Sequence, residues 1–187
     1  MAYHAEHDRI RALLPDGFVS LRPVLRINVE ARGEKEVYVE FNTPVTRDGF
    51  HGWLNICNWL FPAAAAIFSD NGGIDLHTGI LDINFAPVGI GGGCPAENNN
   101  DGCIFFGKEE YVRHPESISA NKEFCDCEFR WKFDSDCAHG KSIGKTLPAF
   151  SEEVKNIYPK RAFTPENAAA IPCDMVLGSY MVEFERL

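Results

Sequence analysis

The chain of 187 residues has no lysine between Glu36 and Gly107, a stretch in which Arg47 is the single basic side chain. A protein forms a Schiff base through a primary amine, normally a lysine whose pKa is lowered by burial or by a neighbouring cation. The absence excludes such chemistry from this stretch. Lys141 and Lys145, which lie next to glycines in a later segment, are the candidates for a relocated amine, although the favoured interpretation is that both are solvated loop lysines.

Long apolar runs and an excess of basic residues are also absent. The longest apolar run, around Leu60–Phe68, is interrupted by Pro62, whereas a membrane-spanning helix needs roughly 18 apolar residues. The formal net charge is −9, and nucleic acids and anionic membranes attract basic surfaces. We therefore expect neither a nucleic-acid partner nor a membrane.

The first residues contain no apolar segment of the kind found in secretory signals. The seven cysteines are odd in number and irregularly spaced, which favours free thiols over a disulfide framework. Both features predict a cytoplasmic protein. The length and the 45% hydrophobic content predict one globular domain over residues 1–187.

Alternating polar and apolar residues predict a sheet. A strand over Val19–Glu30, a turn at Ala31–Lys35 and a strand over Glu36–Pro44 form a hairpin, and an apolar strand through Trp53 follows the turn at Arg47–Gly49. The clearest alternation covers Phe124–Phe133, which predicts one buried and one wet face.

Helices are expected to be few and short, over His4–Leu14, near Ser151–Ile157 and near Thr164–Ala170. The alanine-rich run before Phe68 fits either a strand or a short helix, and the glycine- and asparagine-rich Val88–Gly102 predicts a loop. The fold class expected is mainly antiparallel β with short covering helices, with α+β as the alternative.

The order of five segments resembles the acetoacetate decarboxylase superfamily. These segments are HDRIRALLPDGF (7–18), LRPVLRINVE (21–30), VYVEFNTPV (37–45), GWLNICNWLFPAAAAIF (52–68) and VLGSYMVEFERL (176–187). The resemblance implies a β-barrel around a buried pocket. In that family a turn reading roughly GRE follows the alanine-rich run, and the first lysine of a nearby PKK forms the Schiff base. Here the corresponding place reads SDNGGIDLHTG (69–79), without a lysine.

The resemblance also implies a site. The family has a pocket glutamate that binds or protonates the substrate, and Glu40 occupies its place, so we expect Glu40 to be the catalytic residue; the alternative is that Glu40 faces solvent. A hairpin places Arg26 or a residue next to it opposite Glu40, although a register error of one residue reverses the faces. The residues expected to contact the substrate are Arg26, Asn28, Tyr38 and Trp53. No cofactor is expected.

Three functions remain open on this basis. The first is a lyase-like protein that acts on a small organic acid or carbonyl compound without the Schiff base. The second is a non-catalytic binding or sensor module, and the third is an acid–base enzyme of another class that uses Glu40. A homo-oligomer is expected because Phe50, Trp53, Trp59, Phe61 and Phe68 supply more aromatic surface than one strand buries.

One group of cysteines has two interpretations. Cys125, Cys127, Cys137 and His139 form a C-x-C…C-x-H set, and residues two apart in a strand point the same way, as ligands of a tetrahedral zinc do. The favoured interpretation is that both thiols of the strand extend its apolar face, since buried cysteine packs as a small hydrophobic residue. We therefore expect no metal.

Overall fold

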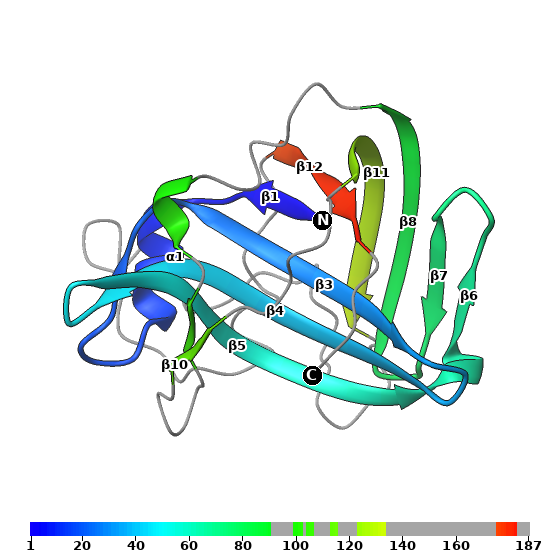
Figure 1. Cartoon of the computed structure of the whole chain (residues 1–187), viewed down its shortest axis with the longest axis horizontal. Helices are drawn as coiled ribbons and strands as arrows, with labels where there is room; N and C mark the ends of the chain where they lie inside the picture. Colours follow the sequence, from blue (N-terminus) through cyan, green and yellow to red (C-terminus); the bar gives the residue numbers. More distant parts are fainter. Residues whose placement is uncertain (91–98, 103, 107–112, 116–122, 134–174, 183–187) are drawn as a thin grey trace, which may run out of the picture.

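The computed structural model describes a set of residues that contains most of the predicted strands (Figure 1). These residues are 1–90, 99–102, 104–106, 113–115, 123–133 and 175–182. The strands are β1 (Ala2–His4), β2 (Val19–Ser20), β3 (Val24–Arg32), β4 (Glu36–Arg47), β5 (Phe50–Pro62), β6 (Ala66–Phe68), β7 (Ile74–His77), β8 (Leu81–Ile90), β9 (Ile104–Phe106), β10 (Arg113–Pro115), β11 (Glu123–Phe133) and β12 (Met175–Met181). The helices are α1 (His7–Leu13) and two 3-10 turns, Ala63–Ala65 and Asn99–Asp101.

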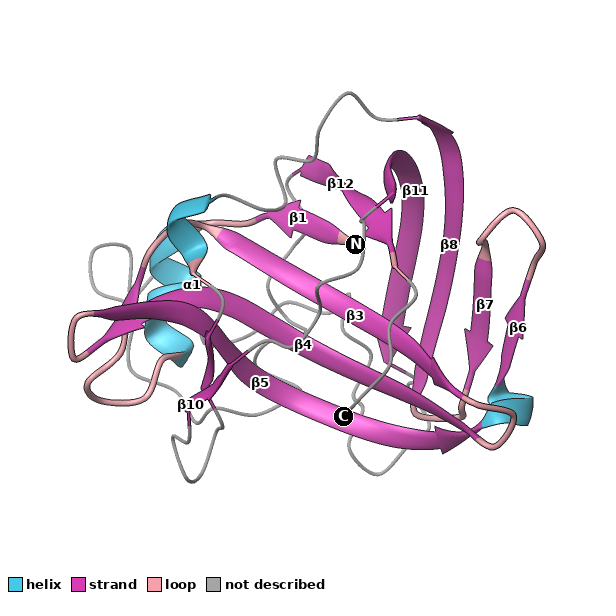
Figure 2. Cartoon of the chain, in the orientation of Figure 1, coloured by secondary structure: helices cyan, strands magenta, loops and turns pink. Residues whose placement is uncertain are grey.

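All of these strands belong to one sheet (Figure 2). Its order is β10-β9-β5-β4-β3-β1-β12-β11-β8-β7-β6, and β2 pairs beside β4. Neighbours are antiparallel, apart from the parallel pair of β5 and β9. The expectation of a mainly antiparallel β fold is therefore confirmed. Within the described strands the path is open, with β10 and β6 as its ends, rather than a closed barrel.

The sheet curls around an apolar core. Val39 and Phe41 alternate with the polar residues of β4 and are fully buried, as expected for a strand with one covered face. The ring centroids of Phe41 in β4 and Trp131 in β11 are 5.2 Å apart. In the sheet, β4 and β11 are separated by β3, β1 and β12. The contact crosses the inside of the curve, so the core lies on the concave side.

The first residues differ from the expected helix over His4–Leu14. Ala2–His4 form β1, which pairs with both β3 and β12, and α1 begins only at His7. The prediction was wrong at this end because the backbone of Ala2–His4 completes hydrogen bonding between two strands, a tertiary effect that overrides local preference. Ile10 and Leu13 of α1 are buried in the core as the periodicity predicts.

Four other expectations are refined. Val19–Glu30 is two strands, β2 and β3, with a break that contains Pro23, and the second strand of the hairpin continues to Arg47. The alanine-rich run, expected to be either a strand or a short helix, contains one of each: a 3-10 turn at Ala63–Ala65 followed by the strand β6. Strand β8 extends into the expected loop as far as Ile90, and Asn99–Asp101 form a 3-10 turn.

Strand β11 confirms the expected alternation. Cys125 is buried, whereas Asp126, Glu128 and Arg130 are exposed.

The helices expected near Ser151–Ile157 and Thr164–Ala170 lie outside the described residues. Among the helices of the described part, none has the length and hydropathy needed to cross a bilayer.

Candidate ligand-binding site

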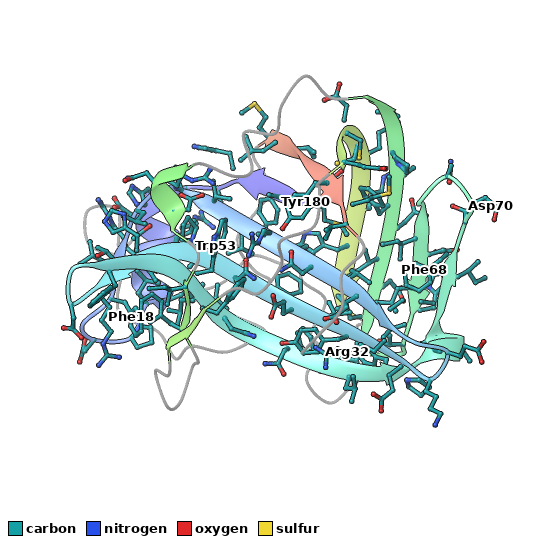
Figure 3. All side chains as sticks on the ribbon, viewed as in Figure 1. Phe18, Arg32, Trp53, Phe68, Asp70 and Tyr180 are labelled. Atoms are coloured by element: carbon teal, nitrogen blue, oxygen red, sulfur yellow. The ribbon has the colours of Figure 1, made fainter. Side chains whose placement is uncertain are left out.

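Polar side chains, buried or half-buried, gather on the side of β3, β4 and β5 that faces away from the apolar core; we call this group the polar face. It consists of Arg26 and Asn28 of β3, Tyr38, Glu40 and Asn42 of β4, and Trp53 and Asn55 of β5. Because successive residues of a strand point to opposite faces, burying Val39 and Phe41 in the core directs their neighbours here. Figure 3 labels Trp53 towards one end of this region and Arg32 towards the other.

The half-buried carboxylate of Glu40 is the centre of the polar face. Its Oε1 accepts hydrogen bonds from the amide nitrogens of Asn28 (2.8 Å) and Asn42 (3.0 Å). Its Oε2 accepts bonds from the hydroxyl of Tyr38 (2.9 Å) and the amide nitrogen of Asn55 (3.0 Å). An ionised carboxylate has roughly four acceptor positions, so these four donors together occupy its hydrogen-bonding capacity.

Strand register determines which residues meet. Asn28 lies directly opposite Glu40, and Arg26 lies opposite Asn42. The expectation that Arg26 or a residue next to it would lie opposite Glu40 was therefore wrong. Asn28, two residues further along β3, takes that place. A register shift between Phe41 and Asn42 also brings Asn55 opposite Asn42. The irregularity is what adds the fourth donor to the carboxylate.

A buried cation lies beside this network. Arg26 is 1% exposed, and its guanidinium carbon lies 3.6 Å from the centre of the Trp53 ring. Its Nε donates a hydrogen bond to Oδ1 of Asn42 at 2.8 Å. Asn42 thus connects Arg26 to Glu40 through one amide. Trp53 is 2% exposed, and Arg22, which forms an ion pair with Asp101, lies 6.0 Å from the same ring.

Tyr38 extends the network towards the other end of the face. Its ring lies 3.9 Å from the guanidinium carbon of Arg32, which forms an ion pair with Glu30. Burial, and after it the negative charge of Glu40, raise the pKa of Tyr38 far above its usual range. The hydroxyl therefore keeps its proton at neutral pH and remains a donor to Glu40.

The structure brings all five residues expected at the site onto one face. Sequence reasoning missed Asn42 and Asn55. Asn42 was detectable, because it is two residues from Glu40 in the same strand and points the same way. Asn55 carried no such signal, since its place depends on the register shift between β4 and β5.

The described residues contain no group of three side chains suited to binding a metal ion. The thiol of Cys125 lies 3.0 Å from the hydroxyl of Ser179, and burial raises the pKa of Cys127. Cys137 and His139, like Lys141 and Lys145, are outside the described residues.

No family model matches the sequence, and no curated protein matches it. Among solved structures, an acetoacetate decarboxylase from Legionella pneumophila is similar, with a TM-score of 0.47 and 13% sequence identity. The similarity covers 69% of this chain and 68% of that chain. It concerns the course of the backbone and not the chemistry of the polar face.

Proposed function

We propose that the polar face binds a small organic acid or carbonyl compound. The observation that carries the proposal is the Glu40 carboxylate, which accepts hydrogen bonds from four side chains next to the buried Arg26. Polar and charged groups that leave water cost free energy unless they are fully paired. A sheet face that only needed covering would be stabilised more simply by apolar residues.

The ligand class follows from the groups present and from the sequence resemblance. Arg26 supplies a planar cation, the group that most often recognises carboxylates in proteins. The amides of Asn28, Asn42 and Asn55 supply donors and acceptors of the kind that orient a small polar ligand. The resemblance to acetoacetate decarboxylases, given by the order of segments along the chain, points to the same class of small acids and carbonyl compounds.

The network favours a positioning role for Glu40 over proton transfer. Each of its oxygens already accepts two hydrogen bonds, so a proton moving to either oxygen would have to displace a donor. The stretch that contains Glu40 also offers no lysine for covalent chemistry. A lyase-like reaction would consequently need an amine from elsewhere in the chain, whereas a binding or sensor protein would not.

Isothermal titration calorimetry with a panel of short carboxylic acids, keto acids and neutral carbonyl compounds tests the proposal. We expect at least one of these compounds to bind the unmodified protein, and Glu40→Gln to weaken its binding by about tenfold or more, since the amides that Glu40 holds in place, and Arg26 through Asn42, would lose their alignment. Glu36→Gln is the matched control, because Glu36 is exposed and lies on the same strand. Binding to none of the panel, or equal binding by Glu40→Gln, would overturn the proposal.

A further inference from the structure

The side-chain amide of Asn55 is held in one orientation. Its Nδ2 donates to Oε2 of Glu40 at 3.0 Å and to the hydroxyl of Tyr38 at 3.2 Å. Turning the amide over would place Oδ1 against the carboxylate oxygen of Glu40, and two acceptors would then face each other without a hydrogen. The hydrogen-bond network therefore assigns the nitrogen to the Glu40 side and leaves Oδ1 pointing away from it.

This fixed orientation leaves a buried acceptor. Oδ1 of Asn55 is removed from solvent and has no hydrogen-bond partner within the part of the chain that the structure describes. A buried acceptor without a donor is unfavourable, and such groups in native proteins generally meet a water or a ligand. Rotating the amide cannot relieve the deficit, because the same rotation would break both bonds of Nδ2.

We propose that Oδ1 of Asn55 accepts a hydrogen bond from a hydroxyl group of the ligand, so that the polar face selects a small hydroxy acid over the corresponding keto acid. The inference rests on the proposed function and narrows its ligand class. A keto oxygen only accepts hydrogen bonds and would lie against another acceptor at this position. A hydroxyl donates its proton to Oδ1 and still accepts from a neighbouring amide.

Selectivity arises from the cost of a missing hydrogen-bond donor. A site that hydrogen-bonds a ligand hydroxyl rejects an analogue without it, because the protein's own polar group is then left unpaired on binding. Asn55 is suited to this role since its amide is positioned by Glu40 and Tyr38 before any ligand arrives. A specificity residue held in advance loses little conformational entropy when the ligand binds.

The test is a comparison of matched ligand pairs by calorimetry: lactate with pyruvate, and 3-hydroxybutyrate with acetoacetate. We expect the unmodified protein to prefer the hydroxy acid of at least one pair by roughly 10- to 100-fold, the range set by one buried hydrogen bond. In Asn55→Ala the ratio within that pair should fall towards one. Asn84→Ala, at an exposed asparagine of β8, should keep the ratio of the unmodified protein.

The outcomes separate this inference from the proposed function. If acids of the panel bind but neither pair shows a preference for its hydroxy acid, the hydroxyl contact is wrong while the binding function stands; a buried water on Oδ1 would produce this result. If none of the four acids and no other compound of the wider panel binds, the proposed function fails and this inference fails with it. The ratio in the unmodified protein decides the question even if Asn55→Ala does not fold.

Discussion

Asn28 and Glu40 lie directly opposite one another across the β3–β4 pair, and the amide nitrogen of Asn28 donates to Oε1 of Glu40 at 2.8 Å. Two adjacent strands therefore position the carboxylate, and β5 adds a third support through Asn55. Because each donor comes from a paired strand, movement of the carboxylate would disturb several hydrogen bonds together. The polar face is accordingly a rigid part of the sheet, and substitutions in it should affect stability as well as binding.

Glu40→Gln is expected to destabilise the protein. Glutamine replaces one acceptor oxygen by an NH₂ group, which would face two donors, Asn28 and Asn42 or Tyr38 and Asn55, whichever way the amide turns. Leaving such groups unpaired costs about 1–3 kcal/mol of unfolding free energy. Urea denaturation at pH 7 measures this, with Glu36→Gln expected to lie within about 0.5 kcal/mol of the unmodified protein.

Tyr38 should make stability fall at high pH. Its pKa is raised in the folded protein, by burial first and by Glu40 second, so the folded state holds the proton more tightly than the unfolded state. Stability is unaffected below the unfolded pKa of about 10 and is lost as the pH rises through and above it. Tyr38→Phe should remove this contribution to the loss of stability in denaturation experiments between about pH 8 and about pH 11. An unchanged pH dependence would contradict the burial of the hydroxyl.

Arg26→Lys is expected to be a harmful exchange although the charge is kept. Lysine cannot stack a planar group 3.6 Å above the Trp53 ring or reproduce the bond from Nε to Asn42. A desolvated cation–aromatic contact contributes about 2 kcal/mol, and we expect a loss of that order in the unfolding free energy. Arg130→Lys, at an exposed position of β11, should be neutral. A neutral Arg26→Lys would mean that charge alone matters at this position.

Borohydride trapping should detect no adduct with the polar face. Acetoacetate or pyruvate plus sodium borohydride should leave every peptide within residues 36–107 unmodified, because that stretch has no lysine, and acetoacetate decarboxylation should be slow or absent. Mass spectrometry of the intact protein and its peptides measures both. Rapid turnover with an adduct at Lys141 or Lys145 would instead show that the amine had moved along the chain.

Homo-oligomerisation remains a prediction. Of the five aromatic residues on which it rested, Trp53 and Phe61 are buried, whereas Phe50 and Phe68 are exposed. Phe68 (43% exposed) and Ile67 (69% exposed) lie on β6, the end strand of the sheet path, and apolar edge strands tend to pair with other chains. Light scattering should give a mass above the 20.9 kDa of one chain, and Ile67→Lys should reduce it. A monomer at micromolar concentration would refute the prediction.

Patterns within single segments predicted much of the fold. The alternation in β11 and the hairpin of β3 and β4 follow from residues that are close in sequence, where the two-residue period decides which side chains are buried. Glu40 and its neighbours Tyr38 and Asn42 also share a face by this rule. What escaped prediction depends on partners distant in sequence: the strand at Ala2–His4 and the approach of Asn55 to Glu40 through a register shift. Neither leaves a local pattern.

The position of β1 has a consequence for how the chain folds. This three-residue strand lies between β3 and β12 in the described sheet, so it joins the half that contains β4 and β5 to the half that contains β8 and β11. Its partner β12 begins at Met175, near the other end of the sequence. Contacts between such distant segments form late and slow the folding of β proteins. During synthesis, the β3–β4–β5 half can assemble early, but the hydrogen-bonded path between the two halves is complete only after β12 has left the ribosome.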